Sequence, residues 1–427
     1  MLSLWRDLIM RADGLGHFTV AKCGLAAAAV VGRARFLVRN LSGRLSRGPA
    51  FPTPRARYLL LGGVAALLGL SGACPAYAQS SQEMSHTPRR FFLSGHSLTD
   101  NPYGNYIKAI SESQGAPLSW NQQIVIGSPI RVRTKGGRDI QGEWEGYAGG
   151  KDRDGRPGVN VLAEFASRTE PLYDTLLIMD AHHTAAQLIW NDTVRYLRHF
   201  HERLIERNKA GRTYILEPWE TLKDLGDPGP WLENERNATV VWSCVATRIN
   251  ASLAHEGRSD RLTTIPTAPA MAALVDAIAS NRAPAALTSG GTRAAIERLL
   301  PDGVHLSSRG HYYAAMLAYM QMTGKETKNA WYPSNALPQS EALALQEFAW
   351  KFLEDRRRNF ALLDLPACRR FIATTYCGPW NAYVPGKWVN RQGNCADFFS
   401  RETVTPNNRN PFVFDAQSDG AYWFASP

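Results

Sequence analysis

Short apolar runs alternate with longer segments of helical spacing along residues 90–324. The apolar runs lie at 91–93, 123–126, 173–179, 213–216 and 262–266. Each is stopped by glycine or by polar residues, as expected for buried strands of a parallel sheet. The segments with helical spacing lie at 106–113, 184–208, 238–254, 268–279 and 311–322. Because the two kinds of segment alternate, the pattern predicts an α/β fold with a mainly parallel sheet.

Breaks in this pattern set the limits of the domain. A stretch rich in Gly, Arg and Asp at 134–158 predicts a long solvated loop inside it. After Gly324 the composition changes, and a helix near 340–358 leads into a tail rich in Cys, Trp and Asn. We therefore expect an α/β domain at 90–324, followed by a helical linker and a C-terminal extension at 325–427.

The N-terminal segment has the pattern of an export signal. Arg55 and Arg57 precede an uncharged apolar run at 58–70, and small residues at Ala76 and Ala78 suit a signal-peptidase site. We expect residues 1–78 to be a leader cleaved after Ala78. The mature chain would then be periplasmic or secreted, and would meet the membrane only in transit. The alternative is an uncleaved anchor, because residues 58–78 are uncharged and just long enough to span a bilayer.

The positive charge of the chain is concentrated in this leader. The whole sequence has 48 Lys and Arg against 38 Asp and Glu, a net charge of +10. Residues 1–78 hold 10 of the basic and 2 of the acidic residues, which leaves the rest a net charge of +2. Such a chain has almost no positive charge with which to neutralise phosphates, so nucleic acid is not an expected partner.

Four cysteines follow the leader, and an even number in an exported chain predicts two disulfides. They are Cys244, Cys368, Cys377 and Cys395. Four cysteines allow three pairings, and the clustering of the last three favours at least one bridge within the tail. No Cys-x-x-Cys pair is present, which argues against a structural metal site.

A serine and a histidine lie where acyl transfer would need them. Ser97 follows the first predicted strand, and reactive groups collect at the carboxyl ends of the strands in open α/β sheets. Asp302 and His305 are three residues apart, so the carboxylate can hold one imidazole nitrogen while the other nitrogen faces a serine. Each feature alone is common in proteins, and their order along the chain says more than either one.

That order resembles the SGNH (GDSL) hydrolase superfamily over residues 90–324. The stretch Gly-His-Ser-Leu-Thr-Asp at 95–100 stands where the family has Gly-Asp-Ser-Leu-Thr-Asp, with His96 replacing Asp. The resemblance implies a three-layer α/β/α domain in which Ser97 is the nucleophile, His305 the base and Asp302 its orienter. It also implies that the backbone N–H groups of Ser97 and Gly127 stabilise the oxyanion. No metal or organic cofactor is expected.

The third block departs from the family. The family commonly has Gly-x-Asn-Asp, whereas this chain has Asp-Ala-His-His at 180–183, which places His182 where the oxyanion-binding Asn belongs. A neutral imidazole can donate one hydrogen bond, so His182 is a candidate oxyanion donor. His183 and Trp219 are candidates for the substrate pocket. The alternatives are a hydrogen-bonded histidine pair at a strand end and a buried tryptophan at a strand exit.

The sequence thus predicts an exported serine esterase acting on an acetyl or short acyl ester, with a polysaccharide as one candidate carrier. Two alternatives stay open. The same acyl-enzyme chemistry serves a polysaccharide O-acetyltransferase, since exclusion of water decides between hydrolysis and transfer. A weakly active or non-catalytic carbohydrate-binding protein of a polysaccharide secretion system, such as one for cellulose, is the rival from another class. The sequence leaves the oligomeric state open.

Overall fold

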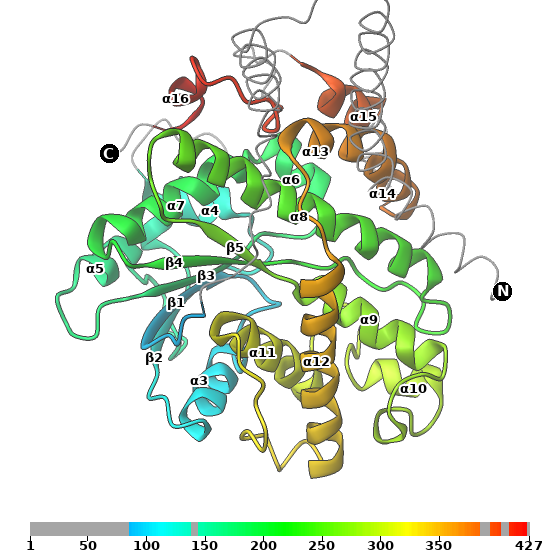
Figure 1. Cartoon of the computed structure of the whole chain (residues 1–427). Coiled ribbons are helices and arrows are strands. Elements are labelled where there is room, and N and C mark those ends of the chain that lie inside the picture. Colours follow the sequence, from blue (N-terminus) through cyan, green and yellow to red (C-terminus); the bar gives the residue numbers. More distant parts are fainter. Residues whose placement is uncertain (1–84, 138–143, 385–392, 403–409, 425–427) are drawn as a thin grey trace, which may run out of the picture. The chain divides into compact units, whose positions relative to one another are not determined.

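A five-stranded, all-parallel sheet forms the centre of the structure (Figure 1). The computed structural model describes residues 85–137, 144–384, 393–402 and 410–424. The strands are β1 (Arg90–Gly95), β2 (Ser119–Ile124), β3 (Thr175–Met179), β4 (Arg212–Leu216) and β5 (Leu262–Ile265). Their order is β2-β1-β3-β4-β5, so the chain reverses its direction across the sheet between β1 and β3.

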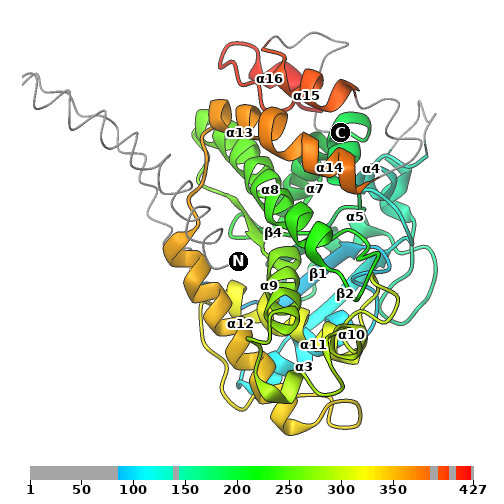
Figure 2. The same cartoon turned by 90° about the vertical axis from the view of Figure 1, so that its right-hand side faces the viewer.

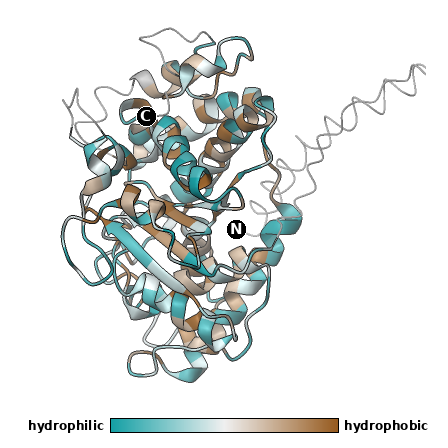
Figure 3. Ribbon diagram, turned by 90° about the vertical axis from the view of Figure 1, so that its left-hand side faces the viewer, coloured by the Kyte–Doolittle hydropathy of each residue, from teal (hydrophilic) through white to brown (hydrophobic). Residues whose placement is uncertain are grey.

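Helices cover both faces of the sheet, which confirms the predicted three-layer α/β/α architecture (Figure 1). One face carries α3 (Tyr103–Ser113), α9 (Thr267–Ala279), α11 (Ser308–Thr323) and α12 (Gln339–Asn359). The other carries α5 (Val161–Ala166), α7 (Thr193–Arg207) and α8 (Gly229–His255). All five residues of β3 are buried, as burial on both faces requires. Figure 3 shows hydrophobic residues along the inner strands of the sheet.

The prediction of a strand at 123–126 is wrong in its position. The strand β2 spans Ser119–Ile124 and is largely polar, while Ile126 beyond its end is 63% exposed. Polar side chains of β2 bond to the inserted loop. For example, the Gln123 amide donates to the Gly146 carbonyl at 2.7 Å. The insertion, which contains the short helix η1 (Glu145–Ala148), therefore covers a polar sheet edge, and α4 (Ile130–Thr134) directly precedes it.

The single helix predicted at 184–208 is two helices. The first, α6 (Thr184–Trp190), ends before Asp192, which has a left-handed backbone with φ of 49°. The second, α7, begins at Thr193, whose hydroxyl donates to the buried carboxylate of Asp180. This hydrogen bond connects the start of α7 to the residue that follows β3. The stretch 281–299 adds η2 (Ala285–Leu287) and α10 (Thr292–Glu297).

The C-terminal extension consists of short helices, most of which lie against α8 (Figure 2). One of them also contacts α6. They are α13 (Leu365–Phe371), the π-helix η3 (Ile372–Tyr376), α14 (Cys377–Tyr383), α15 (Gly393–Ser400) and α16 (Asp419–Tyr422). All four predicted cysteines are paired: Cys244 with Cys368, and Cys377 with Cys395. The first disulfide joins the extension to α8, and the second lies within the extension. The described residues, from 85 to 424, belong to one compact unit.

The predicted leader and its cleavage site lie outside the described residues. Within the described ranges, no helix is long and apolar enough to cross a membrane.

Candidate active site

The candidate residues meet at the carboxyl edge of the sheet, near the switch in strand order. Ser97 follows β1, His182 and His183 follow β3, and Trp219 follows β4. In doubly wound sheets the crevice beside the switch point, here between β1 and β3, is the usual place for a ligand. The topology therefore brings these residues to the expected position for a binding site.

Three side chains form a continuous hydrogen-bonded relay. The Nε2 atom of His305 lies 3.0 Å from the Ser97 Oγ, and its Nδ1 lies 2.6 Å from Asp302 Oδ2. Asp302 Oδ1 also accepts from the backbone N–H of His305 at 2.7 Å. Slight burial opposes ionisation of Asp302, but the hydrogen bonds from His305 outweigh it and lower the pKa of the carboxyl to about 2. A carboxylate on Nδ1 leaves Nε2 as the acceptor for the serine proton.

The turn that carries Ser97 is fixed by close packing at Gly95 and by a hydrogen bond of the buried His96. A side chain at Gly95 would meet the Thr99 hydroxyl at 1.9 Å, so only glycine fits there. His96 is fully buried, and its Nε2–H donates to the Asp180 carbonyl at 2.9 Å. Burial, assisted by the nearby His182 and Arg133, lowers the pKa of His96 to about 3 and keeps it neutral. His96 thus joins the end of β1 to the end of β3.

Two backbone N–H groups that the resemblance assigns to an oxyanion are the next part of the site. Among the described residues, neither the Ser97 nor the Gly127 N–H donates a hydrogen bond to another protein group. The loop that carries Gly127 is tied to β3, because the buried carboxylate of Asp180 accepts from the Ile130 N–H at 2.9 Å. Unpartnered N–H groups at a strand end can stabilise a developing negative charge.

The prediction that His182 donates to the oxyanion does not fit its contacts. Its Nδ1–H is used by the Trp219 carbonyl at 2.6 Å, which leaves Nε2 unprotonated in a neutral ring. Burial lowers the pKa of His182, and the charge of Glu220 offsets only part of that shift. A neutral His182 therefore presents an acceptor rather than a donor.

His183 forms a second imidazole–carboxylate pair at the same edge. Glu220 accepts from the His183 backbone N–H at 2.7 Å, and its other oxygen lies 2.9 Å from Nδ1. Partial burial opposes the charge on His183, but the bond and charge of Glu220 outweigh it and raise the pKa of the imidazole. Its backbone is left-handed, with φ of 63°, a costly conformation that often occurs at functional sites. The two histidines thus bind separate partners and do not pair with each other.

Trp219 is not a wall of the substrate pocket, because its side chain is only 1% exposed. Its indole N–H instead donates to the Val304 carbonyl at 2.9 Å, one residue before His305. Nearby, the Leu222 N–H donates to the Gly303 carbonyl at 2.8 Å. Gly303 has φ of 82°, and a Cβ there would meet the Leu222 carbonyl oxygen at 2.2 Å. The segment after β4 therefore supports the loop that carries the imidazole.

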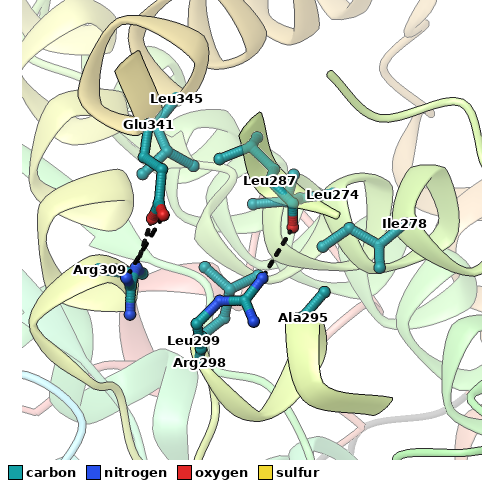
Figure 4. Close-up of a pocket in the computed structure, with 9 residues that line it drawn as sticks. All are labelled: Leu274, Ile278, Leu287, Ala295, Arg298, Leu299, Arg309, Glu341 and Leu345. Atoms are coloured by element: carbon teal, nitrogen blue, oxygen red, sulfur yellow. Dashed lines mark hydrogen bonds and ion pairs between the residues drawn. The ribbon is translucent and has the colours of Figure 1, made fainter. Parts of the chain in front are cut away.

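A small cavity between α9, α10, α11 and α12 is separate from this site (Figure 4). It has a volume of about 10 Å³, room for no more than a single water molecule. On its wall, Arg309 of α11 and Glu341 of α12 form an ion pair at 2.5 Å, which anchors the first turn of α11. Within the described part of the chain, no group of His, Cys, Asp and Glu is arranged to hold a metal ion.

Sequence reasoning missed two residues that contact the site or the segments beside it. Glu220 is the partner of His183, and its position two residues beyond a Glu-Pro step at a strand end was an available signal. Tyr383 contacts the segment after β4 from the extension, and no sequence motif marks it.

The comparisons with known proteins add one distant similarity. The sequence matches no protein-family model, and no curated protein is similar to it in sequence. The chain is similar to a crystal structure of a DUF4886 family protein from Bacteroides uniformis ATCC 8492, with a TM-score of 0.43 and 12% identity. That similarity covers 65% of this chain and 98% of the other.

Proposed function

We propose that this protein is a serine hydrolase of the SGNH type that cleaves an acetyl or short acyl ester. The observation that carries the proposal is the relay from Ser97 through His305 to Asp302, with separations of 3.0 and 2.6 Å. Both distances are within the reach that proton transfer needs. The resemblance of the stretch at 95–100 to the GDSL motif supports the same assignment.

The proposed mechanism uses only residues of this chain. Ser97 Oγ attacks the ester carbonyl while His305 Nε2 takes its proton, and Asp302 stabilises the imidazolium. The N–H groups of Ser97 and Gly127 bind the oxyanion. His305 then gives the proton to the departing alcohol, which leaves an acyl-serine. Water, or the hydroxyl of a sugar in the transferase alternative, then attacks that ester while His305 takes its proton, and His305 returns the proton to the Ser97 oxygen as the acyl group leaves.

The substrate proposal concerns esters carried on a polysaccharide. The imidazole of His305 is 49% exposed and the carboxylate of Asp302 is 54% exposed, so an extended chain can reach the relay. Export of the mature chain to the periplasm or beyond, as the leader predicts, would bring it to such polymers.

One observation favours the rival function of a weakly active binding protein. The position of the family's oxyanion-binding Asn is occupied by His182, which has no proton to offer on Nε2 when neutral. Loss of one such donor typically slows an enzyme by a factor of about 10²–10³. The chemistry would then be slow, and binding of the polymer would be the main activity.

A fluorophosphonate probe tests the proposal, because it reacts with an activated serine. Wild-type protein should be labelled, and Ser97→Ala should not. Ser259→Ala is the matched control, because Ser259 is exposed at the opposite edge of the sheet, and this variant should be labelled fully. Absence of labelling in the wild type, together with polysaccharide binding unaffected by Ser97→Ala, would support the binding protein instead.

A further inference from the structure

Residues 219–223, here called the 219–223 segment, follow β4 and contact the loop of His305, the proposed base, at two points. Trp219 donates through its indole to the Val304 carbonyl, and Leu222 donates through its backbone to the Gly303 carbonyl. The two acceptors directly precede His305. Displacement of the 219–223 segment would therefore displace the imidazole relative to Ser97.

The C-terminal extension contacts the same segment through one side chain. The Tyr383 hydroxyl at the end of α14 donates to the Thr221 carbonyl at 2.5 Å and accepts from the Lys223 N–H at 3.3 Å. The Lys223 ammonium lies 4.2 Å from the centre of the tyrosine ring and donates to the Tyr383 carbonyl. Burial raises the pKa of Tyr383 to about 12, so the hydroxyl keeps its proton.

Two disulfides cross-link the helices on either side of α14. Cys377 is its first residue and is bonded to Cys395 of α15, while Cys368 of α13 is bonded to Cys244 of α8. The second of these bonds closes a sequence separation of 124 residues. Tyr383 therefore contacts the 219–223 segment from an extension that is cross-linked to α8.

We propose that Tyr383 is a positioning residue for the reaction, acting through the 219–223 segment on the loop that ends in His305. The inference rests on the proposed function, and it gives the C-terminal extension a part in the active site. The tyrosine does not touch the substrate. It restrains Thr221 and Lys223, and through Trp219 and Leu222 this keeps Nε2 of His305 within reach of Ser97. A misplacement of about 1 Å can slow an enzyme by about 10²-fold.

Full-length Tyr383→Phe tests the proposal, since it removes the hydroxyl and keeps the ring over Lys223. Tyr313→Phe is the control, because Tyr313 is also buried, 1% exposed against 8% for Tyr383, and its hydroxyl donates to the Ala270 carbonyl at 3.0 Å, away from the 219–223 segment. With 4-nitrophenyl acetate, Tyr383→Phe should lower kcat by about 10–100-fold with KM nearly unchanged. Hydrogen exchange should accelerate in the peptide containing 302–305 in Tyr383→Phe alone, while the two variants lose similar thermal stability.

The outcomes separate this inference from the proposed function. Equal loss of kcat in both variants, or unchanged exchange at 302–305 in Tyr383→Phe, would overturn the positioning role. A wild-type chain that does not react with the fluorophosphonate probe would refute the proposed function instead. In that case the exchange measurement alone decides whether Tyr383 orders the 302–305 loop.

Discussion

Asp302 holds His305 by both of its oxygens, one on the backbone N–H and the other on the imidazole Nδ1–H. This double contact fixes both the place of the ring and the nitrogen that carries its proton. It uses a three-residue spacing, so the geometry within the Asp302–His305 pair is local. The Asp302 carboxylate therefore selects the tautomer of the His305 imidazole and also stabilises the positive charge of its protonated form.

Replacement of Asp302 by Asn should lower kcat by about 10⁴-fold, as a wrong tautomer does in serine hydrolases. An amide N–H facing Nδ1 would move the imidazole proton to Nε2, where it prevents uptake of the serine proton. Steady-state kinetics with 4-nitrophenyl acetate measure the effect. Asp364→Asn is a suitable control, because Asp364 accepts a similar backbone bond from Ala367 at the start of α13. A comparable loss in both variants would contradict the tautomer argument.

His182→Ala should reduce kcat by less than about 10-fold, well below the 10²–10³-fold loss expected from removing an oxyanion donor. The reason is that the only ring proton of neutral His182 is bound to the Trp219 carbonyl. His182→Asn restores the side-chain amide found in the resembling family, and it should be faster than His182→Ala. A 100-fold loss in His182→Ala would mean that Nε2 does carry a proton during the reaction.

Trp219→Phe should lower kcat, because it removes the indole bond to Val304 beside the proposed base. Trp242→Phe makes the same change at another fully buried site, where the indole N–H has no hydrogen-bond partner among the described residues. Both variants should lose stability, and Trp219→Phe should lose about 1–3 kcal/mol more, because an acceptor is left unsatisfied. Chemical denaturation and kinetics together check this; a normal kcat in Trp219→Phe would contradict it.

Glu217 should make the protein less stable as the pH rises. It is fully buried, and burial raises the pKa of its carboxyl to about 7, with Arg356 at 3.5 Å offsetting part of the shift. The folded state then holds a proton that the unfolded state releases above about pH 4.3. The stabilisation that protonated Glu217 gives the folded state is therefore fully present below about pH 4.3. It decreases as the pH rises to about 7, and above pH 7 the free energy of unfolding no longer changes through this group.

Glu217→Gln isolates this contribution, because the amide cannot ionise. As the pH rises from 5 to 8, the free energy of unfolding of the variant should increase relative to that of the wild type. The increase should be about 3 kcal/mol at most. Denaturant unfolding at several pH values measures the difference. Parallel stability curves for the two proteins would show that Glu217 is not protonated in the folded state.

The strands could be located from the sequence where burial on both faces produced a continuous apolar run, as in β3 and β4. Prediction failed for β2, since its Asn and Gln side chains bond to a distant insertion and look like loop residues. The break between α6 and α7 was also hidden, because it depends on the backbone of Asp192 and a contact of Thr193 with Asp180.

In the candidate site, too, some residues could be identified from the sequence and others could not. Ser97, Asp302 and His305 could be found because each belongs to a short local pattern. The state of His182 depends on a carbonyl 37 residues away, and the role of Trp219 depends on a residue 85 positions away. Such contacts have no local signature, so their chemistry could be assigned only once the fold was known.

Ser97 and the imidazole that would activate it are separated by 208 positions in the chain. During synthesis the hydroxyl is made first and has no activator until the loop that carries His305 has been made and has folded against it. Any fragment cut between them would carry a serine of ordinary reactivity. Under the proposed chemistry, interrupted translation or proteolysis would therefore yield products that are harmless to surrounding esters.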